Sequence, residues 1–168
     1  LIRYVLEATV SHLSDSGRIK DQAMKILYID MDNVLVDFPW GIEQLSEKLR
    51  RDYEGDYDEV PDFFKGLPPV DGAIEGFRKL SSHYDTYILS TSPWNNPSAW
   101  TDKLLWVKKH LPETGYKRLI LSHHKNLNSG DYLIDDRLAN GVEQFSGEHI
   151  HFGSDRFPDW DAILEYLL

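Results

Sequence analysis

The sequence contains no cysteine in 168 residues, which excludes a disulfide framework, a thiolate nucleophile and a zinc–thiolate site. It also lacks any apolar run near the ~20 residues that a membrane-spanning helix needs. Its first part has no basic region followed by a long apolar stretch, so it does not resemble a secretory signal. We therefore expect a cytoplasmic protein without a membrane partner.

Basic residues are also scarce. Lysine and arginine number 18 against 28 aspartates and glutamates, which gives a formal net charge of −10 at pH 7. Nonspecific binding to polymeric nucleic acid needs lysine and arginine surfaces that replace counterions, so such a partner is not expected. A small anionic substrate stays compatible with the charge, because a metal ion or a few local cations can invert the sign at one site.

What is present is typical of a globular protein. Hydrophobic residues make up 41% and charged residues 27% of the chain. A chain of this length forms one domain with a substantial core and needs no cross-links.

The segment 1–23 differs from the rest of the chain. Apolar residues recur in it at helical spacing until the sequence SDSG, and they are Ile2, Val5, Leu6, Thr9, Val10 and Leu13. Met24 then opens MKILYIDMDNV, a natural-looking start for a protein that begins on a strand. We interpret 1–23 as an N-terminal extension, either an extra helix or a leader foreign to the natural protein, and both interpretations stay open.

Apolar and β-branched runs predict five strands. They are KILYI (25–29), TYILS (86–90), KRLIL (117–121), DYLID (131–135) and HIHFG (149–153). Continuous apolar runs, as opposed to alternating ones, are typical of parallel strands that are covered on both faces. Helical patterns separate these runs, so the sequence predicts an α/β fold with a mainly parallel five-stranded sheet flanked by helices.

Three helices are expected around this sheet. The first begins after PPVDG, and its pattern residues are Ile74, Phe77, Arg78 and Leu80. The pattern residues of the second are Trp100, Leu104, Leu105, Val107, Lys108 and Leu111, and Pro112 and Gly115 end it. The third closes the chain with Trp160, Ile163, Leu164 and Leu167 as its apolar stripe. Right-handed connections then place the carboxyl ends of all strands at one edge of the sheet, where such folds bind ligands.

The segment 38–69 does not fit the alternation of strands and helices. It begins with FPWGIEQLSEKL, which predicts a helix, and continues through the acidic stretch RRDYEGDYDEVPD to FFKGLPP. We interpret it as a small helical cap inserted after the first strand. The core domain is then formed by 24–37 and 70–168.

Polar residues gather where the predicted strands end. Asp30 and Asp32 follow the first strand, Thr91 and Ser92 the second, Lys125 the third, and Asp135 and Asp136 the fourth. Several carboxylates at one edge need a cation, and an all-oxygen ligand set favours Mg²⁺. Mg²⁺ together with a lysine and hydroxyl groups is suited to holding a phosphoryl group and its developing charge.

These motifs resemble a known family. DMDNVLVDF, LSTSPW, KLLWVKKHL, LSHHKNLNSGDYLIDDR and EHIHF, in this order, resemble the 5′(3′)-deoxyribonucleotidases of the haloacid dehalogenase (HAD) superfamily. The resemblance covers about Met24 to Phe152 and implies a Rossmann-like HAD fold. It also implies a Mg²⁺-dependent phosphomonoesterase whose partner is a small phosphorylated substrate, above all a nucleoside monophosphate; a homodimer stays open.

The resemblance also implies roles for single residues. Asp30 is the expected nucleophile, which forms an aspartyl-phosphate, and Asp32 is the expected acid and base. The Asp30 side chain, the Asp32 main-chain carbonyl and Asp136 are expected to hold Mg²⁺, with Asp135 in support. Thr91, Ser92 and Lys125 are expected at the phosphoryl group: the hydroxyl of Thr91 and the backbone of Ser92 bind it, and Lys125 neutralises its charge.

Aromatic residues near the inserted segment suit a nucleobase. Phe38, Trp40 and Trp94 are our candidates for substrate contact, whereas Phe63 and Phe64 are expected to pack inside the segment. Two departures from the family concern Asn33, where glycine is common, and the short inserted segment. A sugar phosphate or another small metabolite therefore remains an alternative substrate, and a nucleotide-binding module without turnover is a further alternative.

Overall fold

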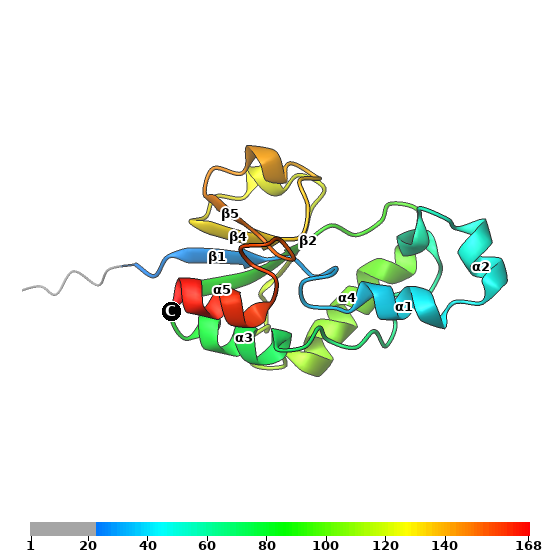
Figure 1. Ribbon diagram of the computed structural model, residues 1–168, viewed down its shortest axis with the longest axis horizontal. Helices are drawn as coiled ribbons and strands as arrows, with labels where there is room; N and C mark the ends of the chain where they lie inside the picture. The colour runs from blue at the N-terminus through cyan, green and yellow to red at the C-terminus, as the bar shows by residue number, and fades with distance from the viewer. Residues whose placement is uncertain (1–22) are drawn as a thin grey trace, which may run out of the picture.

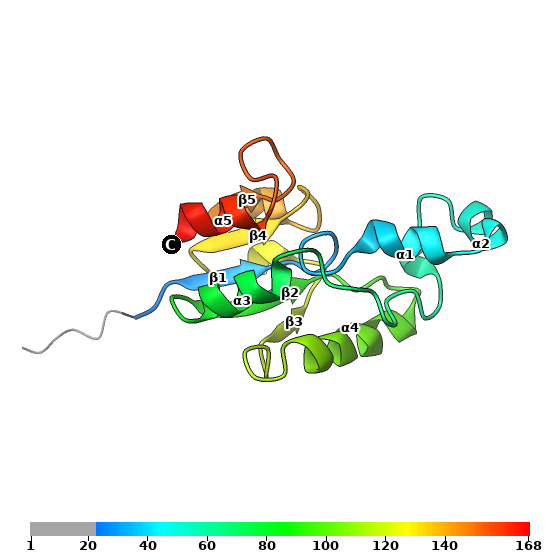
Figure 2. The same cartoon turned by 60° about the horizontal axis from the view of Figure 1, so that its bottom comes forward.

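The computed structural model describes residues 23–168, so the predicted extension lies outside the described residues except for its last residue. Five parallel strands form one sheet in the order β3-β2-β1-β4-β5 (Figures 1 and 2). They are β1 (Ile26–Ile29), β2 (Asp85–Ser90), β3 (Leu119–Leu121), β4 (Tyr132–Asp135) and β5 (Glu148–His151). The predicted α/β fold with a five-stranded parallel sheet is confirmed.

The limits of β3 and β5 differ by two residues at one end from those predicted, and the backbone gives the reason. Lys117 has φ = 58° and Gly153 has φ = 79°. Both values lie in the left-handed region, which is incompatible with a strand. β3 therefore begins only at Leu119, and β5 ends at His151 before the turn.

The two faces of the sheet are covered differently. Helices α3 (Ala73–Ser81), α4 (Pro97–His110) and α5 (Trp160–Leu167) contribute to the main core, which contains Leu27, Ile29, Ile88, Ile134 and Ile150. The alternate strand residues Tyr28, Leu89 and Leu133 pack on the other face with Val142 and Phe145. Val142 opens the short helix η3 (Val142–Gln144), so one face carries long helices and the other a compact loop region (Figure 1).

The buried face of α4 differs from our expectation. Leu104 and Leu105 were expected in its apolar stripe, but they are 47% and 53% exposed. The helix instead buries Ala99, Lys103, Trp106 and Val107, which recur at three- and four-residue spacing. The prediction was wrong because a lysine occupies one position of the buried face, which hides the period from a search for apolar residues.

The inserted segment 38–69 contains two short helices where we expected one. They are α1 (Phe38–Gln44) and α2 (Glu47–Asp52), and η1 (Tyr57–Glu59) follows. Leu45 is extended, and the Ser46 hydroxyl accepts a hydrogen bond from the Leu49 amide at 3.3 Å, so Ser46 caps a new helix. The segment extends beyond the carboxyl edge of the sheet (Figure 2).

The inserted segment shares its core with the sheet. Phe63, Phe64 and Leu67 are buried in the same apolar cluster as the residues of β1 and β2. Trp106 of α4 ties the two parts together by donating its indole N–H to the Leu67 carbonyl at 2.9 Å. Of the helices between residues 23 and 168, none is both long and apolar enough to span a membrane.

Candidate active site

The register of the sheet brings the predicted residues together. Ile29 at the end of β1 lies opposite Ile88 of β2 and Ile134 of β4, so the residues that follow these strands meet at one edge. The Asp30 amide continues the ladder by donating to the Ile134 carbonyl at 2.9 Å. As a result, Asp30 lies directly beside Asp135, the last residue of β4.

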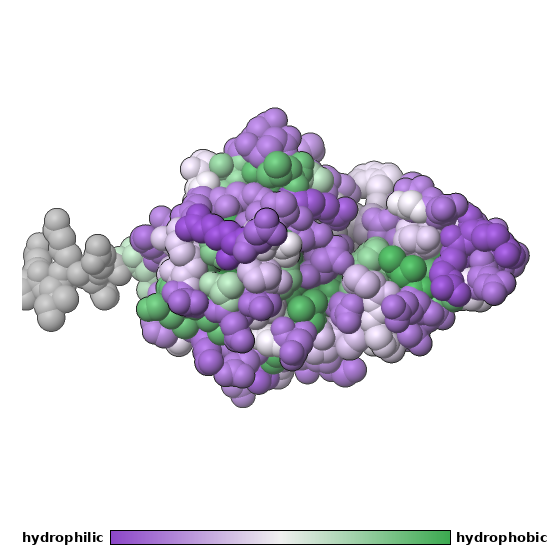
Figure 3. Space-filling model, in the orientation of Figure 1, coloured by the Kyte–Doolittle hydropathy of each residue, from purple (hydrophilic) through white to green (hydrophobic). Residues whose placement is uncertain are grey.

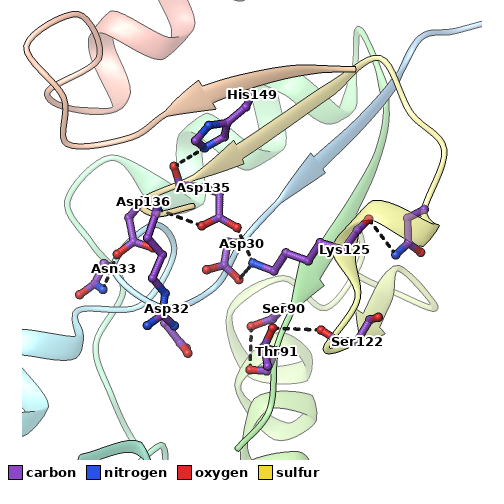
Figure 4. A network of polar contacts seen from close by, with 12 residues as sticks. Asp30, Asp32, Asn33, Ser90, Thr91, Ser122, Lys125, Asp135, Asp136 and His149 are labelled. Atoms are coloured by element: carbon purple, nitrogen blue, oxygen red, sulfur yellow. Dashed lines mark hydrogen bonds and ion pairs between the residues drawn. The ribbon is translucent and has the colours of Figure 1, made fainter. Parts of the chain in front are cut away.

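Asp30 and Lys125 form a buried ion pair at this edge. Lys125 opens the short helix η2 (Lys125–Leu127), and its Nζ lies 2.9 Å from Asp30 Oδ1 and also donates to Asp135 Oδ2. Asp30 is 2% and Lys125 is 3% exposed. Figure 4 shows the lysine side chain reaching both carboxylates from its own loop. Burial alone would lower the pKa of Lys125, but the charges of Asp30 and Asp135 outweigh it and raise that pKa.

Three carboxylates meet at this point and suit a cation. One oxygen each from Asp30, Asp135 and Asp136 lies within 4.8 Å of the others. Burial, and then the charge of Asp30, raises the pKa of Asp135 to about 7 and also raises that of Asp136. Within residues 23–168, Asp136 Oδ1 is buried without a hydrogen-bond partner, whereas the ammonium group of Lys125 is the neighbour of Asp30 Oδ1. Lys125 supplies one positive charge for three acids, so the donor set fits a divalent metal ion with oxygen ligands.

Neighbouring side chains contact Asp135 and Asp136 at the end of β4. Asn33 adopts a left-handed backbone with φ = 61°, and its Nδ2 donates to Asp136 Oδ2 at 2.7 Å. The rings of His149 and His151 are stacked, and each Nε2 lies within hydrogen-bond distance of a main-chain carbonyl, that of Asp135 at 3.1 Å and that of Asp136 at 2.8 Å. Asn33 thus adopts a left-handed backbone, which glycine also adopts readily, and its side chain contacts one of the acids.

Asp32 has a partner that our sequence analysis missed. Lys103 of α4 is fully buried, and its Nζ lies 2.9 Å from both Asp32 oxygens. Burial raises the pKa of Asp32, although the charge of Lys103 opposes this shift. Two sequence signals pointed to Lys103: its place on a helix face with Ala99 and Trp106, and its position as the first residue of the motif KLLWVKKHL.

The two hydroxyl residues after β2 have different surroundings. Thr91 is half-buried, and its Oγ1 donates to the Ser122 carbonyl at 3.0 Å (Figure 4). Ser92 is fully buried, and its hydroxyl has no hydrogen-bond partner. Both residues lie at the same sheet edge as Asp30, but the Thr91 hydroxyl is engaged with the main chain.

The aromatic candidates fall into two groups. Phe38 is half-buried and packs on Phe63 with ring centroids 4.7 Å apart, while Phe63 and Phe64 are 6% and 2% exposed. Trp94, by contrast, is 76% exposed and Trp40 is 41% exposed. Trp94 lies in a turn that follows the segment Thr91-Ser92-Pro93, and the Trp100 indole donates to the Pro93 carbonyl at 3.1 Å, which fixes that segment.

Sequence comparisons identify relatives over most of the chain. Residues 39–157 match the family model described as 5′ nucleotidase, deoxy (pyrimidine), cytosolic type C protein (NT5C). A protein of Vibrio phage KVP40 that is named as a 5′(3′)-deoxyribonucleotidase is 57% identical over 151 residues, which cover 90% of this chain and 89% of that protein. A protein of Bordetella pertussis with the same name is 33% identical over 74% of this chain and 81% of its own length.

Solved structures share the fold at low identity. A HAD hydrolase of Bacillus subtilis, solved with magnesium bound, has a TM-score of 0.53 and 15% identity over 82% of this chain and 92% of its own. A haloacid dehalogenase-like hydrolase of Xanthomonas campestris has a TM-score of 0.51 and 10% identity over 77% of this chain and 83% of its own. These two structures show that the fold is that of HAD hydrolases. By its sequence, the chain belongs to the deoxy-pyrimidine 5′-nucleotidase (NT5C) family, and it is a nucleotide phosphatase.

Proposed function

We propose that this protein is a Mg²⁺-dependent phosphomonoesterase that converts deoxynucleoside monophosphates to nucleoside and phosphate through an aspartyl-phosphate on Asp30. The observation that carries the proposal is the buried Asp30–Lys125 pair beside Asp135 and Asp136. The names of the relatives support the nucleotide as substrate. In this proposal 38–69 is a cap, and 24–37 together with 70–168 is the core domain.

The reaction runs in two steps. The Asp30 carboxylate attacks phosphorus, the bond from phosphorus to the nucleoside oxygen breaks, and Asp32 gives that oxygen a proton. Asp32 then takes a proton from a water molecule that attacks the aspartyl-phosphate, which releases phosphate and restores Asp30. Thr91, the backbone of Ser92 and Lys125 hold the transferred group and neutralise its charge.

A divalent ion, when bound, supplies positive charge that stabilises the developing negative charge on the phosphoryl oxygens. The Asp30 side chain, the Asp32 main-chain carbonyl and Asp136 would hold it, and Asp135 would support it. The buried Asp136 Oδ1, which has no hydrogen-bond partner among the described residues, fits this assignment. Mg²⁺ is proposed because all these donors are oxygen atoms.

Substrate contact is proposed for Ser92, Phe38, Trp40 and Trp94. The buried hydroxyl of Ser92 has no partner among residues 23–168, so it is free to donate a hydrogen bond to a phosphoryl oxygen, and the two tryptophans offer exposed rings. Phe63 and Phe64 are enclosed in the core, which leaves few aromatic faces on the short cap. A sugar phosphate is therefore the second candidate substrate. A cytoplasmic location and a homodimer stay predictions.

A phosphate-release panel tests the proposal. Purified protein with Mg²⁺ is given 5′- and 3′-deoxynucleotides, ribonucleotides and sugar phosphates, and we expect the deoxynucleotides to have the highest kcat/KM. Faster release from sugar phosphates would contradict only the substrate class. Tight nucleotide binding without any release would contradict the enzymatic role of the site.

A further inference from the structure

Lys103 is a buried charged residue to which the proposed reaction assigns no role. It is 0% exposed and projects from the middle of α4 toward the end of β2. Its ammonium group donates to both Asp32 oxygens at 2.9 Å, to Ser90 Oγ at 3.0 Å and to the Thr91 carbonyl at 2.6 Å. The ring of Phe64 lies 4.6 Å from Nζ and closes the remaining side.

These contacts provide hydrogen-bond acceptors for the whole ammonium group of Lys103. An ammonium group has three protons to donate, and Asp32, Ser90 and Thr91 provide acceptors for all of them. A buried charge without such partners is strongly unfavourable, so the side chain has little freedom to leave this position. Because Lys103 meets both carboxylate oxygens, it also fixes the plane of the Asp32 side chain.

The two buried lysines separate the two acids of the DxD motif. Lys125 pairs with Asp30 on the side of the metal-binding carboxylates, and Lys103 pairs with Asp32 on the side of α4. Asp32 is accordingly not a member of the cluster formed by Asp30, Asp135 and Asp136. Its side chain is thus held apart from the groups that bind a cation.

We propose that Lys103 is a positioning residue that holds the Asp32 carboxylate in place for proton transfer to the leaving group. The inference rests on the proposed function, because it assigns the proton transfer to Asp32. Lys103 itself has no contact with the reacting atoms in this scheme, since Asp32, Ser90, Thr91 and Phe64 surround its ammonium group. Phe64 links the same lysine to the inserted segment.

A change of leaving group distinguishes a positioning role of Lys103 from a general structural defect of the variant. An alkyl phosphate such as a deoxynucleotide needs a proton on its leaving oxygen, whereas p-nitrophenolate leaves as a stable anion. We expect Lys103→Met to lower kcat for a deoxynucleotide by about 10²-fold, as loss of general acid catalysis does, with little change in KM. With p-nitrophenyl phosphate the same variant should release the first equivalent of p-nitrophenolate rapidly and then turn over slowly, because Asp32 still has to activate water.

A double-mutant cycle provides the second readout. Asp32→Asn should show the same burst followed by slow turnover, and adding Lys103→Met to it should lower neither phase further. The double variant removes both charges of the buried pair, so it leaves no unpaired charge and remains measurable if Lys103→Met alone unfolds. Lys108→Met, an exposed lysine on the same helix, is the matched control and should behave as the wild type.

Two results would overturn the role of Lys103. One is an equal loss in the first turnover of p-nitrophenyl phosphate and of the deoxynucleotide in Lys103→Met. The other is a further loss on adding Lys103→Met to Asp32→Asn. A wild-type protein that releases phosphate from neither substrate contradicts the proposed function itself and, with it, this inference.

Discussion

At the scale of residues, the site depends on how buried charges are paired. Asp30 and Asp32 are separated by a single residue, and both are at most 5% exposed. Each forms an ion pair with a different buried lysine. Lys125 lies on the side of Asp135 and Lys103 on the side of α4. Burial raises the pKa of Asp32, and the charge of Lys103 opposes this shift. The pairing keeps two neighbouring carboxylates chemically distinct.

Removing the nucleophile should stop turnover and leave the fold intact. In Asp30→Asn the neutral amide cannot attack phosphorus, so we expect phosphate release to fall at least about 10³-fold, whereas the loss of one charge from a crowded cluster is tolerated. Phosphate release and circular dichroism measure the two properties. Asp71→Asn, an exposed acid, serves as the control. A near-normal rate in Asp30→Asn would show that the nucleophile is misassigned.

The exposed tryptophans test where the nucleobase stacks. Trp94 is 76% exposed in the turn three residues after Thr91, so its ring is available to stack on a base. Such stacking contributes roughly 1–3 kcal/mol per base in other proteins. We expect Trp94→Ala to raise KM for a deoxynucleotide about tenfold or more and to leave KM for deoxyribose 5-phosphate unchanged. Trp40→Ala is the matched comparison on the inserted segment. Equal effects on both substrates would argue against stacking.

At the scale of elements, the packing of α3 on α5 supports the loop after β1. Gly76 of α3 faces the Trp160 ring, and a Cβ at this position would lie 2.3 Å from Trp160 Cε3. The close approach lets the Trp160 indole donate to the Val34 carbonyl at 2.9 Å, two residues after Asp32. A glycine in one helix thus allows a tryptophan in another to fix the loop after β1, which carries the proposed catalytic residues.

Gly76→Ala should therefore destabilise the protein although alanine favours helices. The added methyl group overpacks the α3–α5 contact, which costs typically about 1–3 kcal/mol, and this exceeds the gain in helix propensity of about 1 kcal/mol. For a chain of this size the melting temperature falls roughly 2–4 °C per kcal/mol. Thermal unfolding measures the change. Glu75→Ala, at the exposed neighbouring position, should not lower the melting temperature by this amount, and an unchanged melting temperature in Gly76→Ala would contradict the predicted clash.

At the scale of the whole molecule, charge is distributed unevenly. Hydrophilic residues dominate the face shown in Figure 3, and hydrophobic ones form small separate patches. The net charge of −10 would oppose the approach of a phosphate dianion. The buried lysines Lys103 and Lys125 offset two of the four carboxylate charges at the site, and the proposed divalent ion would offset the other two. The site would then no longer repel an anion as strongly as the rest of this acidic molecule does.

Metal binding should stabilise the folded protein through Asp136. Free Mg²⁺ at about 100 times its dissociation constant adds roughly 2.7 kcal/mol to the free energy of unfolding. We expect the melting temperature to rise with Mg²⁺ but not with NaCl at equal ionic strength. Asp136→Asn should abolish this rise and leave the metal-free protein at least as stable, because burial and the charge of Asp30 already raise the Asp136 pKa. A rise that persists in Asp136→Asn would place the metal elsewhere.

The sequence alone determined the five strands, their parallel arrangement and the edge at which Asp30, Thr91, Lys125 and Asp135 meet. It could do so because hydrophobic periodicity encodes burial, and parallel strands end at one edge. The limits of β3 and β5 were less accurate, since they depend on single left-handed residues that apolar runs do not reveal.

Only the tertiary structure decided which partner each buried charge meets. Lys103 and Asp32 are 71 residues apart in sequence, and nothing local to either residue announces the other. The same holds for Phe64, which the fold places over the Lys103 ammonium group. It also holds for the Trp94 ring, which the fold leaves exposed. The local sequence pattern predicts that a residue is buried. Its partner depends on how α4, the inserted segment and the sheet pack together, and that packing is a property of the whole chain.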